Sequence, residues 1–174
     1  MTKPEQTSPL SNLSEAYENM YKHVADNIHK ITDKTGPLLH DLIDEAKQKG
    51  GELDNLTEEE INNLGTWLKR DLDDMIHYAS DTEHAVIDWL GFEASLMKNT
   101  MIQMMLEAAD KTTVELLRMK DNAHKPVSYH TGEMTGFGTL ICDECGEKLH
   151  FHEAGHIPPC PKCHKTQFHR IQID

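Results

Sequence analysis

Four cysteines near the C-terminus are the residues whose type and spacing point most directly to chemistry. They form two Cys-x-x-Cys pairs separated by fourteen residues: Cys142 and Cys145, then Cys160 and Cys163. Each Cys-x-x-Cys turn brings two sulfurs to one ion, and two turns supply the four thiolates of a tetrahedral Zn²⁺ site. The sequence therefore predicts a structural zinc site that is closed, with no position open for catalysis.

Redox chemistry is the alternative use of such cysteines. A thioredoxin-like pair requires a surrounding βαβ pattern, which this sequence lacks. Residues 1–9 contain no apolar segment of a signal peptide, and no apolar run approaches the roughly 18–20 residues that span a bilayer. We therefore expect a cytoplasmic protein without membrane contact. A reducing cytoplasm keeps cysteines as thiols, which favours zinc over disulfides.

Three short segments around the cysteine pairs alternate polar and apolar residues as strands do: 138–141, 147–152 and 166–171. Two cysteine turns joined to three short strands make a zinc ribbon. The 49 residues from 126 to 174 can bury little apolar surface. Zinc binding should therefore contribute much of the folding free energy of this module.

A second apparent metal motif lies in the loop of the ribbon. His152, Glu153 and His156 match the His-Glu-x-x-His pattern of zinc proteases, which needs both histidines on one helical face and the glutamate as general base. Gly155 and the prolines 158–159 break any helix here, so we predict no hydrolase and no enzyme. Five ribbon histidines are open to a second metal or a pH response, although we expect ordinary exposed residues: His150, His152, His156, His164 and His169.

Upstream of residue 126 the chain has the apolar spacing of helices. Stripes with steps of three and four cover residues 13–31, 38–46, 61–79 and 86–119. If the segment 80–122 were unbroken, it would be about 60 Å long at 1.5 Å per residue. A helix of that length needs partners. We predict a mainly α chain: an antiparallel helical bundle or coiled coil, then a small C-terminal β zinc ribbon. The sequence leaves open whether the long helix is continuous and whether it forms a homo-oligomer.

Composition suggests three parts: a disordered N-terminus at 1–10, an acidic helical domain at 11–125 and a zinc ribbon at 126–174. Up to residue 125 there are 24 acidic and 13 basic residues, and beyond it 6 and 4. This acidity disfavours nonspecific binding to nucleic acids and to anionic membranes. The aspartates at 71, 73 and 74 are expected on a solvated helix face.

The C-terminal pattern resembles a known family. Its residues are Tyr129-His130-x-Gly132-Glu133-x-x-Gly136-x-Gly138-x-Leu140-x-Cys142-x-x-Cys145, then Cys160-Pro161-x-Cys163 and Phe168-x-Arg170. This run is similar to that of the YbeL-like zinc-ribbon-containing proteins of bacteria. Further upstream the resemblance rests on charged helix segments such as Lys69-Arg70-Asp71-Leu72. It implies a fold and a zinc site, and no activity. The His152–His156 motif is not part of the shared pattern.

Three residues of this pattern have no metal role: Tyr129, His130 and Glu133. We expect them to anchor the ribbon to the helices, since the glycines around them require a fixed loop shape. The alternative is a contact surface for a partner.

These features together favour a non-enzymatic cytoplasmic adaptor or regulator that binds an unidentified protein partner. The alternative is a factor associated with the ribosome, RNA or DNA, in which the ribbon contacts nucleic acid through its histidines and four cations: Lys148, Lys162, Lys165 and Arg170. Four basic residues are few for such binding, and the acidic helices oppose it.

Overall fold

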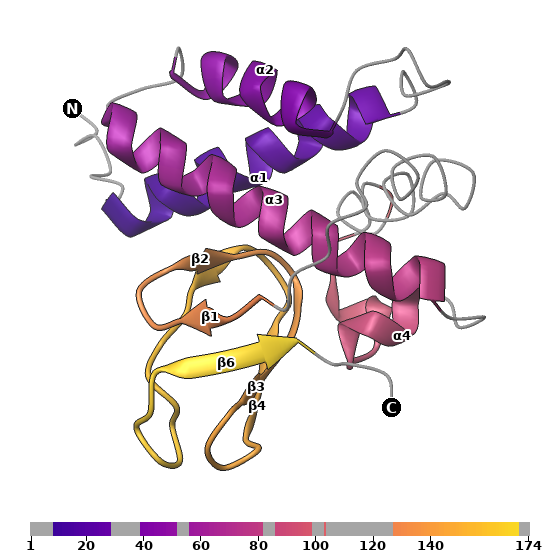
Figure 1. The fold of residues 1–174 in the computed structure, drawn as a ribbon, viewed down its shortest axis with the longest axis vertical. Coiled ribbons are helices and arrows are strands. Elements are labelled where there is room, and N and C mark those ends of the chain that lie inside the picture. The colour runs from indigo at the N-terminus through magenta and orange to yellow at the C-terminus, as the bar shows by residue number, and fades with distance from the viewer. Residues whose placement is uncertain are drawn as a thin grey trace, which may run out of the picture.

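The computed structural model describes residues 9–28, 39–51, 56–81, 86–98, 103 and 127–170. The first three helices pack together as a helical layer, and the strands form a small ribbon beneath the third of them, with the short fourth helix beside the ribbon (Figure 1). The helices are α1 (Pro9–Asn27), α2 (Leu39–Gly51), α3 (Glu58–Asp81) and α4 (Val86–Leu90), followed by a 3₁₀ turn, η2 (Ala94–Leu96). None of the helices in this described part of the chain is long and apolar enough to cross a membrane.

The predicted apolar stripes form the helical core. Leu64, Leu68 and Leu72 of α3 are at most 1% exposed and belong to the same buried cluster as the stripes of α1 and α2. A capping box starts α3: the Glu60 N–H donates to Thr57 Oγ1 (3.2 Å), and the Thr57 N–H donates to Glu60 Oε2 (2.8 Å). Helices first and a β region last are thus confirmed, while a bundle or coiled coil stays a prediction.

The segment 80–122 does not form one unbroken helix. Helix α4 ends at Leu90, and Gly91 has a φ of 72°, the left-handed conformation that commonly terminates helices. After Gly91 the chain makes only the short turn η2 before residue 98. The rest of the predicted stripe, at residues 99–102 and 104–119, lies outside the described residues.

Six strands build the ribbon: β1 (Tyr129–His130), β2 (Met134–Thr135), β3 (Gly138–Cys142), β4 (Lys148–Phe151), β5 (Gly155–His156) and β6 (Gln167–Arg170). A four-stranded sheet has the order β1-β6-β3-β4, and β2 pairs with β5. All these pairs are antiparallel. The predicted strands correspond to β3, β4 and β6, whereas the two-residue strands were not predicted.

The ribbon and the helices share a core. Met134, Phe137 and Ala154 of the ribbon belong to the helical cluster, and the Phe137 ring meets the Tyr21 ring of α1 edge to face, with centroids 4.9 Å apart. Close packing therefore continues across the boundary that the sequence suggested near residue 125. The ranges 1–10, 11–125 and 126–174 stay a prediction.

Gly138 is a position where the fold requires glycine. Its φ is +132°, and a Cβ there would lie 2.3 Å from Arg170 Nη1 and 3.3 Å from the Trp89 ring. We expect Gly138→Ala to lower the free energy of unfolding by about 2–4 kcal/mol, because it strains the backbone and displaces a buried guanidinium. Urea unfolding measures this change.

Gly155→Ala is the matched control in the same ribbon. A Cβ there would meet only the Phe151 ring, at an ordinary 3.8 Å. We expect a change within about 0.5 kcal/mol. Equal stability of the two variants would contradict the role given to Gly138.

Candidate metal centre

The four cysteine sulfurs meet at one point. All lie within 4.8 Å of one another, with 3.5 Å between Cys142 and Cys163 and 3.6 Å between Cys145 and Cys160. Zn–S bonds of about 2.3 Å at tetrahedral angles place sulfurs about 3.8 Å apart, so this donor set fits one zinc ion. Among the described His, Cys, Asp and Glu residues, it is the one group of three or more with such spacing.

The two cysteine turns have the same backbone geometry. The Gly146 N–H donates to the Cys142 carbonyl, and the His164 N–H donates to the Cys160 carbonyl, both at 2.9 Å. Gly146 has a φ of 72°, and His164 adopts a φ of 60°, an uncommon conformation for a residue other than glycine. Each turn thus fixes its two sulfurs in the same way. Backbone hydrogen bonds hold the two cysteine turns, and a bound metal ion would hold them further.

The metal centre is closed on its inner side. Cys142 and Cys160 are buried, whereas Cys145 and Cys163 are half-buried. The sulfurs pack against a small apolar cluster made of Tyr129, Leu140, Leu149, Ile157 and Phe168. With four protein ligands no coordination position remains for a substrate, so zinc here would hold the ribbon together.

The His-Glu-x-x-His segment does not form a protease site. His152 and Glu153 lie in a bend after β4, and His156 lies in β5, so the two imidazoles do not share a helical face. Glu153 pairs with Lys98 at 3.8 Å. His152 instead meets the Phe92 ring edge on, with centroids 4.6 Å apart.

Tyr129 and Glu133 contact helix α3, as the anchor interpretation expects. The Tyr129 hydroxyl donates to Asp74, and the Arg70 guanidinium lies 3.9 Å from the centre of the Tyr129 ring. Arg70 also donates to the Glu133 carboxylate and to the Met134 carbonyl (2.9 Å). His130 takes another direction, pairing with Glu133 at 3.5 Å within the ribbon.

Asp71 of α3 lies at the centre of this interface. It is 3% exposed, so the predicted solvated face is wrong at this position, because the ribbon covers it. Its carboxylate accepts hydrogen bonds from four groups of three segments: the Tyr17 hydroxyl of α1, the adjacent Arg70 Nε (3.2 Å), the Thr135 hydroxyl (3.2 Å) and the Gly136 N–H (2.7 Å).

Arg170 of β6 completes the network. Its guanidinium donates to the Thr135 hydroxyl (2.7 Å), lies 3.7 Å from the Asp71 carboxylate and lies 4.7 Å from the centre of the Trp89 ring. Arg170 is 3% exposed. The prediction that Arg170 is a cation available to nucleic acid is therefore wrong, because the residue is buried against the helices.

Burial and neighbouring charges determine the protonation states of the network. Burial raises the pKa of Tyr17 and of Tyr129 well above 10, and the nearby Asp71 raises both further. Burial alone would lower the pKa of Arg170, but Tyr129 and Asp71 raise it, and the net direction is upward. The phenols therefore stay neutral donors and the guanidinium stays charged. Among the described residues, every buried side-chain nitrogen or oxygen has a hydrogen-bond partner.

The sequence contained a signal for Asp71 that composition hides. Asp71 lies three residues after Leu68 and four before Met75, both fully buried on the apolar stripe of α3. A charged residue at that spacing faces the core. No comparable signal marks Arg170, whose neighbours alternate as in any short strand.

The chain belongs to the family described as "Zinc-ribbon containing domain", which matches residues 26–172. It is similar to the "Uncharacterized protein YbeL" of Escherichia coli K12, with 27% identity over 133 residues, which cover 74% of this chain and 79% of the relative. The proteins of the same name from Escherichia coli O6:H1 (strain CFT073) and O157:H7 match with the same figures. No solved structure matches. The resemblance seen in the sequence is thus confirmed.

The sulfur geometry predicts one metal ion per chain. We expect the full chain to bind one Zn²⁺, and its Co²⁺ form to absorb as a tetrahedral tetrathiolate. Cys160→Ser should weaken zinc binding by more than about 100-fold, beyond the loss typical of outer-shell partners. His156→Asn is the control, since His156 lies outside the sulfur cluster. Equal loss in both variants would contradict a four-cysteine site.

The buried phenols predict a loss of stability at alkaline pH. Unfolded tyrosines ionise near a pKa of about 10, and the folded pKa values of Tyr17 and Tyr129 lie above this. Their contribution is therefore complete below that pH and is lost as the pH rises above it. Tyrosinate absorbance from these two should appear together with loss of helical circular dichroism. Ionisation of all four tyrosines near pH 10 with the helices intact would refute this.

Proposed function

We propose that this protein is a non-enzymatic adaptor or regulator of the cytoplasm, in which a structural zinc ribbon presents a fixed surface to a protein partner. The observation that carries this proposal is the combination of a closed four-cysteine centre with a ribbon locked onto the helices. The four-cysteine centre leaves no coordination position for a substrate, and the contacts with the helices hold the ribbon in one orientation.

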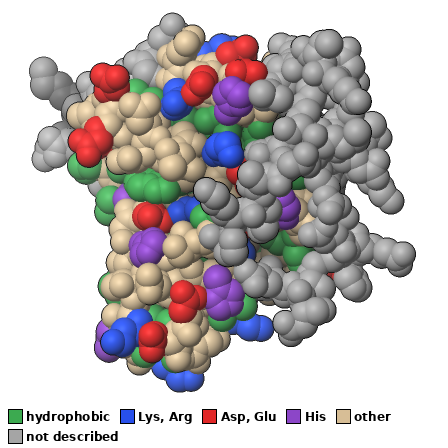
Figure 2. All heavy atoms as spheres, viewed as in Figure 1, with side chains coloured by type: hydrophobic (Ala, Val, Ile, Leu, Met, Phe, Trp, Pro, Cys, Tyr) green, Lys and Arg blue, Asp and Glu red, His purple; other side chains and the backbone are tan. Residues whose placement is uncertain are grey.

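The charge distribution favours a protein over a nucleic acid as partner. Of the four ribbon cations, Arg170 is buried, and Lys162 lies 3.8 Å from the Glu147 carboxylate. Lys148 and Lys165 are exposed, and Lys148 directly follows Glu147 in the chain. On the face in Figure 2, acidic, basic and imidazole side chains are mixed over the ribbon, without a basic patch. Phosphate binding depends on such patches.

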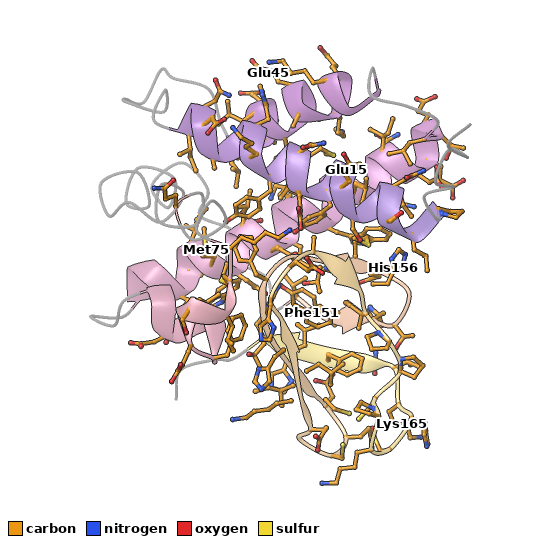
Figure 3. The ribbon with its side chains drawn as sticks, turned by 180° about the vertical axis from the view of Figure 1, so that it is seen from behind. Glu15, Glu45, Met75, Phe151, His156 and Lys165 are labelled. Carbon is orange, nitrogen blue, oxygen red and sulfur yellow. The ribbon has the colours of Figure 1, made fainter. Side chains whose placement is uncertain are left out.

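The end of the ribbon remote from the helices is the surface best placed to meet a partner. Lys165 lies there, whereas Glu45 of α2 lies at the opposite end of the molecule (Figure 3). His164 and Lys165 follow the second cysteine turn, so their backbone is fixed by the metal centre. A partner bound at this tip would contact a preformed surface, which lowers the ordering cost of binding.

Site-specific photo-crosslinking in cells tests this proposal. We expect a photoreactive residue at position 165 to give a discrete protein adduct that resists nuclease, and one at the exposed Gln48 of α2 to give none. Adducts removed by ribonuclease or deoxyribonuclease would instead support the nucleic-acid alternative, in which affinity falls steeply with salt. Absence of adducts at position 165 would contradict both.

A further inference from the structure

The metal centre is connected to helix α3 by one row of paired residues. Cys142 in β3 is paired with Phe168 in β6, and Phe168 is paired with Tyr129 in β1. All three are at most 1% exposed and belong to the ribbon core. The hydroxyl of Tyr129 leaves this core and donates to Asp74 of α3. A residue packed with the cysteines is therefore also a contact of the helical layer.

Asp71 extends this connection to helix α1. Its carboxylate accepts from the Tyr17 hydroxyl of α1, and on the ribbon side from the Thr135 hydroxyl (3.2 Å) and the Gly136 N–H (2.7 Å). The Arg170 guanidinium lies 3.7 Å away. One buried carboxylate thus holds α1, α3 and the ribbon at the same point.

Loss of the metal would disturb this point from the ribbon side. The ribbon core is small, so without zinc its strands lose much of what keeps them folded. Thr135, Gly136 and Arg170 would then leave Asp71. A buried carboxylate stripped of its partners is strongly disfavoured, so water must enter and α1 must loosen from α3.

We infer that zinc binding at the cysteines and the packing of α1 on α3 are one coupled equilibrium, connected through Asp71. Zinc occupancy then determines whether the helical layer is ordered. The ribbon acts as a metal-responsive clamp on the helices. By linkage the coupling is reciprocal: the factor by which zinc stabilises the packing of α1 on α3 is also the factor by which that packing strengthens zinc binding. A change in α3 that disturbs Asp71 should therefore weaken zinc binding. This inference does not depend on the proposed function.

Zinc affinity of helix variants tests the coupling, measured on the full reduced chain by competition with a chromophoric chelator. We expect Asp71→Asn to weaken zinc binding by about tenfold, within the range typical of coupled sites. The control is Asp73→Asn on the same helix, whose carboxylate pairs with Lys69 at 2.8 Å. It should change affinity by less than about twofold, as expected for a surface ion pair. Unchanged affinity in a folded Asp71→Asn protein would overturn the inference.

Two gentler variants cover the case in which Asp71→Asn does not fold. Tyr17→Phe removes only the α1 hydroxyl from Asp71 and should weaken zinc binding by about fivefold, at the low end of typical coupling between sites. Tyr21→Phe, one turn further along α1, removes a hydroxyl that meets Met75 Sδ at 3.8 Å and should have no effect. Equal affinities for these two variants would contradict the role of Asp71.

The reciprocal measurement follows the helices while zinc is removed. Removal of zinc from the full chain with a chelator should reduce the helical circular dichroism. It should also change the fluorescence of Trp89, which lies against Arg170. Zinc should restore both. A helical signal that stays constant while the metal leaves would overturn the coupling.

Discussion

The buried carboxylate of Asp71, held between two guanidinium groups, is the constraint on which the arrangement of this molecule depends. Burying three charged groups is expensive, and such a cluster adds less stability than its contacts suggest. Its hydrogen bonds are directional, however. The Tyr17 hydroxyl of α1 and the Gly136 N–H of the ribbon donate to Asp71 from different segments, and the Arg170 guanidinium of β6 forms an ion pair with it. Apolar packing alone would allow the ribbon to slide on α3, whereas these bonds define one position.

The four-cysteine centre could be predicted because its information is local. Each Cys-x-x-Cys turn encodes its own geometry, and only the meeting of two turns needed the fold. The amphipathic helices and strands β3, β4 and β6 were also readable, since each is long enough to show a period. Strands β1, β2 and β5 have two residues each, too few for alternation. They exist because the neighbouring strands and helices hold them.

The interface could not be predicted because its residues depend on partners far along the chain. The charge of Asp71 predicts a solvated position, although its spacing on α3 faces the core. The charge of Arg170 predicts an exposed cation, since nothing near it in sequence indicates the helices that cover it. Gly91 interrupts an apolar stripe that continues on both sides, so periodicity alone leaves open whether the helix runs through it. At Arg170 tertiary contacts decided the outcome against the local pattern, whereas at Asp71 the charge was misleading and the helical spacing was not.

The pattern that carries the family resemblance describes a docked ribbon rather than an isolated one. Besides the cysteines it contains Tyr129, Glu133 and Arg170, each of which forms a hydrogen bond or an ion pair with a residue of helix α3. Two of its glycines also face the helices: a Cβ at Gly136 would lie 3.2 Å from the Tyr17 hydroxyl, and one at Gly138 would lie 3.3 Å from the Trp89 ring. These glycines permit close approach and do not make a flexible linker. The helices therefore set the orientation of the ribbon, and the ribbon and the helices that hold it form one structural unit.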